Sequence, residues 1–246
     1  MRTETDYKKL WLGIDATTLE NWAFRGGETA DQLSHVFIAA YQAAIHATFK
    51  ELDKSHWICF AASEDKSGVL PGVSIKDQRL SGTKTWVASS DLVEEIIVYV
   101  DGRSFLVSAD ASTVNVETYP DAKFLPGMSQ GRATLSNARP NAELTLTMPF
   151  NLAEAYFVTC AACGYLCNRF ARLNETTLQS TASDLFNSLS GGPEGINPKA
   201  FADCYEQTKG LGKQCGALDA DNANDWQQNG RLLGLYSKPV AQRAMT

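Results

Sequence analysis

The sequence predicts an α+β protein in which helical segments flank a central antiparallel β-barrel or sandwich. Apolar residues recur at helical spacing near both ends of the chain. The middle instead holds short β-branched runs separated by Gly, Asp, Asn and Pro. Because no crossover helix interrupts these runs, we expect antiparallel pairing. The expected domains are a helical segment over 1–56, a β-domain over 57–149 and a second helical segment over 150–246.

The composition indicates a globular chain. Its 246 residues are 44% hydrophobic, which is enough to build a large core. The net charge of −6 argues against binding to a nucleic-acid backbone. The N-terminus shows no apolar signal region, and no apolar run reaches about 18 residues, the length that would span a membrane. We therefore expect a cytoplasmic protein with neither a nucleic-acid nor a membrane partner.

The first helical segment holds two expected helices. Residues 29–52 carry apolar side chains at helical spacing and begin with threonine and aspartate, both good N-cap residues. Residues 8–24 predict a shorter helix before it. We expect Gly26 and Gly27 to end that shorter helix, because glycine commonly follows a helix C-terminus.

Eight short runs in the middle of the chain predict eight strands. Asp101 and Gly102 lie between two of them and indicate a tight hairpin. The expected strands cover residues 57–63, 72–75, 84–89, 94–100, 104–109, 114–119, 132–138 and 143–148.

The last segment returns to helical spacing. Residues 152–173 are apolar on most faces and predict a buried helix. A short helix is expected over 183–189, with a break at 191–193. Pro198 is suited to start another helix, and 225–243 predict a final one.

Three of the six cysteines, Cys160, Cys163 and Cys167, share one stripe of the predicted buried helix. No second Cys-x-x-Cys or Cys-x-x-His accompanies them, so we interpret them as buried thiols and expect no metal site. The three histidines are too scattered to suggest one.

Four motifs occur in a recognisable order between residues 57 and 140. They read FAASED over 60–65, RLSGTKTWVASS over 79–90, LPGMSQG over 125–131 and ATLSNARP over 133–140. Together they resemble the acyl-CoA dehydrogenase family, which has a Thr-Glu strand end, Leu-x-Gly-x-Lys-x-Trp-Ile-Thr-Asn, a Leu-Gly-Met-Arg loop and a strand ending in Asn-Val-x-Val-Pro.

The resemblance implies that the β-domain binds the flavin of FAD, with one strand lying against the ring and another at the ring's polar edge. Backbone N–H groups and hydroxyls on those strands would stabilise charge that develops on the ring. Large aromatic residues on apolar strands are also ordinary core residues, so packing is the alternative interpretation. The residues that match the flavin-contacting positions are Phe60, Ala61, Ala62 and Ser63 on the first strand and Trp86, Val87 and Ala88 on the second.

The sequence also departs from the family pattern. The helical segments are shorter than in typical members, and 66–71 replace a longer Gly-rich turn. Ala88 lacks the hydroxyl of the matching threonine, and Ser129 stands where the family often has arginine. The catalytic base is not identified: Glu206, in a Tyr-Glu-Gln-Thr stretch, is the candidate by similarity to the family's Tyr-Glu-Gly-Thr, with a solvated helix glutamate as the alternative.

Two functions follow from the resemblance. The first is an FAD-dependent oxidation of a CH–CH bond in an acyl-CoA or other acyl thioester. The alternative is a relative without catalysis, which has lost the oxidation or FAD itself and acts as a flavin or acyl-thioester binding protein or as a partner subunit. Small residues at Ala161, Ala162 and Gly164 suit close helix packing, so a homodimer is expected, or a hetero-oligomer with a longer relative.

Overall fold

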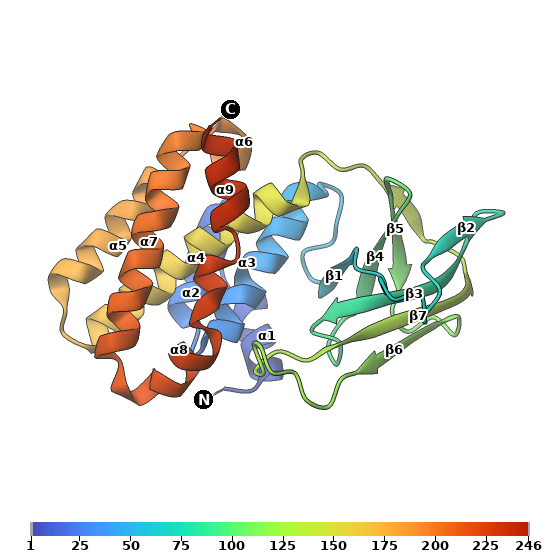
Figure 1. Cartoon of the computed structure of the whole chain (residues 1–246), viewed down its shortest axis with the longest axis horizontal. Coiled ribbons are helices and arrows are strands. Elements are labelled where there is room, and N and C mark those ends of the chain that lie inside the picture. Colours follow the sequence, from blue (N-terminus) through green and yellow to red (C-terminus); the bar gives the residue numbers. More distant parts are fainter. Residues whose placement is uncertain (1, 246) are drawn as a thin grey trace. The chain divides into compact units, whose positions relative to one another are not determined.

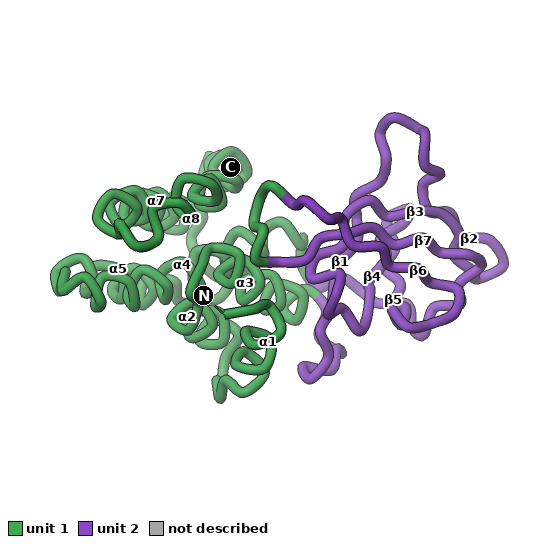
Figure 2. The backbone as a smooth tube through the Cα atoms, turned by 90° about the horizontal axis from the view of Figure 1, so that it is seen from below, with its two compact units in different colours: residues 1–48, 123–127, 148–246 green, residues 49–122, 128–147 purple. Residues whose placement is uncertain are grey.

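The computed structural model describes residues 2–245 and confirms the predicted α+β order, with helices at both ends and strands between them (Figure 1). Contacts divide the chain into two compact units. One contains the helices and residues 123–127, and the other contains the strands (Figure 2). Among the described residues, no helix has both the length and the apolar character needed to cross a membrane.

The helical unit is organised around α4, which packs against α2, α3, α5 and α7. Its first helices come from the start of the chain and the others from its end. The bounds are α1 Glu4–Leu12, α2 Leu19–Thr29, α3 Leu33–Thr48, α4 Phe150–Arg172, α5 Thr176–Ser188, α6 Gly192–Gly195, α7 Pro198–Leu218, α8 Ala223–Asn229 and α9 Ser237–Ala244, with 3₁₀ turns η1 Ala220–Asn222 and η2 Gly230–Gly234.

The prediction that Gly26 and Gly27 end a helix is wrong, because both lie inside α2. A Cβ at Gly27 would overlap the carbonyl oxygen of Ala161 on α4, and one at Gly164 on α4 would overlap the carbonyl oxygen of Phe24 on α2. These glycines therefore permit close contact between two helix backbones. The contact also places the small residues of α4 against α2 of the same chain, so they do not form a face left for a second copy.

Other helix bounds also differ from expectation. The predicted helix over 8–24 is two helices, α1 and α2, and the one over 29–52 is shorter because Ala30 is extended. The helix expected over 183–189 begins earlier, as α5. The single helix expected over 225–243 is broken into α8, η2 and α9, and the 3₁₀ turn between them begins and ends with glycine. Pro198 starts α7 as predicted, with the Asn197 side chain as N-cap.

The strand unit is a sandwich-type arrangement of two four-stranded sheets within the described residues, and all eight expected strands form. One sheet has the order β1-β4-β5-β8 and the other β2-β3-β7-β6. The strands are β1 Ile58–Ala61, β2 Ser74–Lys76, β3 Arg79–Ala88, β4 Glu95–Val100, β5 Arg103–Ser108, β6 Val114–Thr118, β7 Gln130–Ala138 and β8 Ala142–Leu144.

The expectation of uniformly antiparallel pairing is wrong for one pair, since β1 and β4 run parallel. After β1 the chain crosses into the other sheet to form β2 and β3 and then returns, and such a crossover connection allows parallel neighbours. The remaining pairs are antiparallel.

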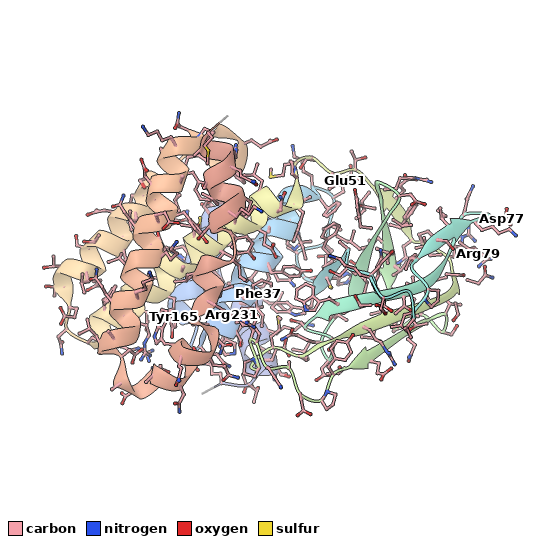
Figure 3. All side chains as sticks on the ribbon, viewed as in Figure 1. Phe37, Glu51, Asp77, Arg79, Tyr165 and Arg231 are labelled. Carbon is pink, nitrogen blue, oxygen red and sulfur yellow. The ribbon has the colours of Figure 1, made fainter. Side chains whose placement is uncertain are left out.

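Two tight turns close hairpins in this unit. Asp101 and Gly102 both have positive φ between β4 and β5, as the sequence predicts. Asp77 and Gln78 also have positive φ, in the turn between β2 and β3. Figure 3 labels Asp77 and Arg79 at this turn. Positive φ at both central residues is typical of turns that match strand twist.

Candidate functional site

A β-bulge lies at the centre of the predicted site. In the pairing of β3 with β7, Lys84 lies opposite Ala133 and Val87 opposite Gly131, so β3 holds one extra residue between these positions. A bulge of this kind redirects side chains relative to a regular strand. The extra residue falls in the Thr85–Trp86 segment and sets where the Trp86 side chain points.

The bulge frees the backbone of Thr85 to connect other strands. Its N–H donates a 2.9 Å hydrogen bond to the carbonyl oxygen of Ser63, just beyond the end of β1. Its carbonyl oxygen accepts a 2.8 Å hydrogen bond from the Tyr119 hydroxyl. The strand end and the Trp86 strand, which belong to different sheets, are therefore joined directly at this point.

Trp86 is half-buried and its orientation is held by a hydrogen bond. The indole Nε1 donates to Oε1 of Gln130, the first residue of β7, at 3.2 Å. The ring therefore has a fixed direction and keeps some accessible surface.

The first predicted strand contributes residues of two kinds. Phe60 and Ala61 are buried, and the Phe60 ring packs 5.6 Å from Phe49 and 5.9 Å from Tyr99 between centroids. Ala62 and Ser63 are exposed. The Phe60 side chain is thus a packing residue, whereas the two exposed residues are accessible to a ligand.

The second strand shows a similar division. Val87 and Ala88 are both buried. The N–H of Ala88 points toward Sγ of Cys59 on β1 at 3.3 Å. The structure thus brings the two predicted strands together, and the residues whose side chains keep accessible surface are Ala62, Ser63 and Trp86.

An ion pair that the sequence interpretation missed supports this strand end. Lys84 is only 1% exposed, and its ammonium pairs with the Glu64 carboxylate and donates to the carbonyl oxygen of Ala62 at 3.4 Å. Burial acts to raise the pKa of Glu64, but hydrogen bonds from Lys84 and from the Val73 N–H hold that pKa below its usual value. Glu64 and Lys84 both lie inside the matched motifs. Their opposite charges in those motifs were the only sign of the ion pair in the sequence.

The accessible polar group at this strand end is a neutral hydroxyl, and the nearby cations are already paired. The Ser63 hydroxyl is exposed and has no hydrogen-bond partner among residues 2–245. Lys84, the cation of the strand pair, is already committed to Glu64. Arg132 does not replace the arginine missing at Ser129, because it lies on β7 and pairs with Glu117 of β6 at 2.7 Å.

The helical unit holds the candidate base and a second carboxyl. Glu206 lies exposed on α7 and pairs with Lys209 at 2.6 Å, which is the arrangement of a solvated helix residue. Glu154 on α4 is half-buried and accepts a hydrogen bond from Tyr236. Burial raises the pKa of Glu154 to about 7. Sequence reasoning missed Glu154, because a glutamate on an apolar helix reveals nothing of its surroundings.

The cysteines are buried thiols, as interpreted from the sequence. Burial raises the pKa of Cys167 to about 11 and that of Cys215 to about 12, which makes these thiols poor nucleophiles near neutral pH. No group of three or more potential metal-ligating side chains comes together within the described part of the chain.

Comparison with known proteins identifies the fold. No family model matches the sequence, and no curated protein matches it significantly. Solved structures do match. Glutaryl-CoA dehydrogenase from Mycobacterium smegmatis aligns with a TM-score of 0.68 and 11% identity over 97% of this chain and 85% of its own. Butyryl-CoA dehydrogenase from Megasphaera elsdenii gives 0.64 and 10% over 100% and 90%. FkbI, from the biosynthesis of a methoxymalonyl extender unit, gives 0.69 and 13% over 92% and 82%.

Proposed function

From the acyl-CoA dehydrogenase fold that this chain has, we propose that it is a flavoprotein that binds FAD and oxidises the CH–CH bond of an acyl thioester. The observation that carries the proposal is the joining of the Ser63 strand end to the Trp86 strand through Thr85. It leaves an exposed hydroxyl just beyond the end of β1 and a half-buried indole on β3. One solved relative of this fold, a glutaryl-CoA dehydrogenase, is described in complex with FADH2.

The residues of the site divide the work of holding the flavin. When bound, FAD would accept the hydride that leaves the thioester. Ser63 would donate from its hydroxyl to the polar edge of the ring, where negative charge develops. Trp86 would pack against the ring. The backbone groups of the two strands would face the ring at Phe60, Ala61, Ala62, Val87 and Ala88. Lys84 acts indirectly by holding the carbonyl oxygen of Ala62.

Oxidation also requires a carboxylate to take the α-proton. Glu206 remains the candidate suggested by sequence similarity, but its exposure and its pairing with Lys209 favour a surface role.

The alternative is a protein that binds flavin or an acyl thioester without oxidising it, or that serves as a partner subunit. Ala88, which offers no hydroxyl, and the surface position of Glu206 favour this alternative. A homodimer, or a hetero-oligomer with a longer relative, remains part of the proposal, as does a cytoplasmic location. Light scattering after size-exclusion chromatography measures the assembly.

Dye reduction with a panel of acyl-CoAs separates the two functions. Turnover by the FAD-loaded chain supports the enzyme, and loss of that turnover in Glu206→Gln would identify Glu206 as the base. Flavin binding without turnover on any thioester supports the binding protein or partner subunit. A folded chain that binds neither FAD nor an acyl-CoA contradicts both.

A further inference from the structure

Three cations form a row across neighbouring strands at one end of the strand unit. Lys76 of β2 lies directly opposite Arg79 of β3. Leu80 of β3 lies opposite Ala138 of β7, so continuing that register by one residue places Arg139 opposite Arg79. Residues that lie opposite each other project from the same face of a sheet. All three cations are exposed, and Figure 3 labels Arg79 at this end of the sheet.

This cation row, Lys76, Arg79 and Arg139, is not neutralised by a carboxylate from residues 2–245. Within that range Lys76 and Arg139 have no ion-pair partner, and Arg79 donates to the carbonyl oxygen of Asn137 at 3.2 Å. Asp77, in the adjoining turn, pairs with none of them. Like charges placed directly opposite each other destabilise a sheet. The row is therefore a local cost to the fold.

The other arginines of the strand unit follow the usual pattern. Arg103 pairs with Glu143 at 2.6 Å, and Arg132 pairs with Glu117 at 2.7 Å. In both cases the partner lies on the neighbouring strand. The unpaired cations are thus confined to one place, in a chain whose net charge is −6.

Protection of a sheet edge does not account for the row. Lysine on an edge strand discourages the addition of further strands, which would explain Lys76 on β2. Arg79 belongs to β3, however, and Arg139 directly follows β7, and both of these strands have a neighbour on each side. The two arginines are therefore better explained by an anionic partner.

The spacing of the row indicates what kind of anion fits. Neighbouring strands lie about 4.8 Å apart, so the three cations extend over about 10 Å instead of converging on one point, as a single phosphate would require. On a helix, residues at i and i+4 lie about 5–6 Å apart, and residues at i and i+7 are about 10 Å apart along the axis. Carboxylates at i, i+4 and i+7 therefore match the row. A long nucleic acid fits less well, because the net charge of −6 repels it.

We propose that the cation row binds an acidic helix of a partner protein, which presents carboxylates at i, i+4 and i+7. The flanking residues on the same face of β2 and β3 are Ser74 and Ser81, which lie opposite each other and are exposed. Their small side chains leave room for a helix to approach. This surface is distinct from the proposed flavin site, because Arg79 begins β3 and Trp86 lies near the other end of that strand.

NMR titration of the full chain with a synthetic peptide tests the proposal. The peptide is an alanine-rich helix with glutamates at i, i+4 and i+7, and its control is an isomer with the same glutamates spread around the helix. At low salt we expect amide shifts confined to residues 74–81 and 136–140, weaker binding of the isomer, and loss of binding as salt is added.

Charge reversal then tests the residues. The double variant Lys76→Glu with Arg139→Glu should lower peptide affinity by at least about tenfold, because two attractive charges become repulsive. It should not lower the melting temperature, since each new carboxylate lies next to Arg79. Lys50→Glu with Lys66→Glu is the matched control, because both lysines are exposed on the strand unit away from the row and the change in net charge is the same.

Four results would overturn the proposal. They are no binding of the peptide to the parent chain, equal binding of the two isomers, equal affinity of the double variant and its control, and tighter binding of a DNA duplex than of the peptide. The last result would assign the row to nucleic acid. The comparison of the two isomers uses the parent chain alone, so it decides the question even if a variant does not fold.

Discussion

The backbone N–H of Thr85 donates a 2.9 Å hydrogen bond to the carbonyl oxygen of Ser63 and so joins the segment that follows β1 to β3, a strand of the other sheet. The bond exists because a bulge in β3 releases Thr85 from its pairing with β7. It sets the positions of the Ser63 hydroxyl and the Trp86 indole relative to each other. The proposed flavin site therefore depends on a backbone feature as much as on its side chains.

Trp86→Ala should weaken FAD binding by roughly tenfold, about 1.4 kcal/mol, because it removes an aromatic contact with the ring. The matched control is Ile97→Ala on β4, which is fully buried and should cost about 2–5 kcal/mol of stability by leaving a cavity. FAD titration and urea unfolding measure the two effects separately. Equal loss of FAD in both variants would mean that Trp86 is a packing residue only.

Glu64→Gln should destabilise the strand unit more than Lys84→Met. The first change leaves the buried Lys84 ammonium without its anion, at a cost of about 1–3 kcal/mol, whereas the second leaves a partly exposed carboxylate that water can solvate. Denaturant unfolding of both variants measures the difference. A smaller loss of stability in Glu64→Gln than in Lys84→Met would contradict this prediction.

The Glu64 pair also predicts a pH dependence. Because the folded pKa of Glu64 is depressed, its contribution is present above its unfolded pKa near 4.5 and is lost as pH falls through the folded value. Glu64→Gln should therefore lose less stability than the parent chain over that acidic range. Identical acid profiles for the two chains would argue against the pair.

Gly164→Ala should cost about 1–3 kcal/mol, because the added methyl group overlaps the Phe24 carbonyl and forces α2 and α4 apart. Gly210→Ala is the control on α7, where a Cβ meets no atom within 4 Å. It should stabilise the protein by up to about 1 kcal/mol through helix propensity. Thermal unfolding measures both, and a neutral Gly164→Ala would show that the two helices are not in close contact.

Glu154→Gln should change the stability of the protein between about pH 4.5 and 7. The folded pKa of Glu154 is raised to about 7, so the folded state holds this proton more tightly than the unfolded state does. Stability of the parent chain therefore falls as pH rises through that window. The variant should lose this decline and be the more stable chain at pH 8. Urea midpoints at several pH values test this, and a parent chain whose stability rises with pH relative to the variant would contradict it.

Local patterns predicted most of the fold. All eight strands were expected, because alternating apolar residues and turn residues such as Asp101 and Gly102 mark them within a few positions. The parallel pairing of β1 with β4 was missed, because it depends on the route the chain takes through the second sheet. Gly26 and Gly27 were misread as a helix end because the partner that requires them, α4, lies more than a hundred residues away in the sequence.

The candidate site was predictable in outline. The matched motifs located the strands of Ser63 and Trp86, which the structure brings together. The bulge, the burial of Lys84 and the surroundings of Glu154 could not be read from the sequence, because each arises from tertiary contacts. Three expectations remain predictions. They are the flavin contacts of the seven matched residues, the catalytic role of Glu206 and the bounds of the three domains.

The amount of FAD bound per chain tests the central claim most directly. The purified chain is incubated with excess FAD and desalted, and its flavin absorbance is compared with its protein concentration. The account predicts close to one FAD per chain, reduced in a Trp86→Ala variant and retained in an Ile97→Ala variant that remains folded. A chain with intact secondary structure by circular dichroism that retains no flavin, even at high FAD concentration, would contradict the claim that β1 and β3 form a flavin site.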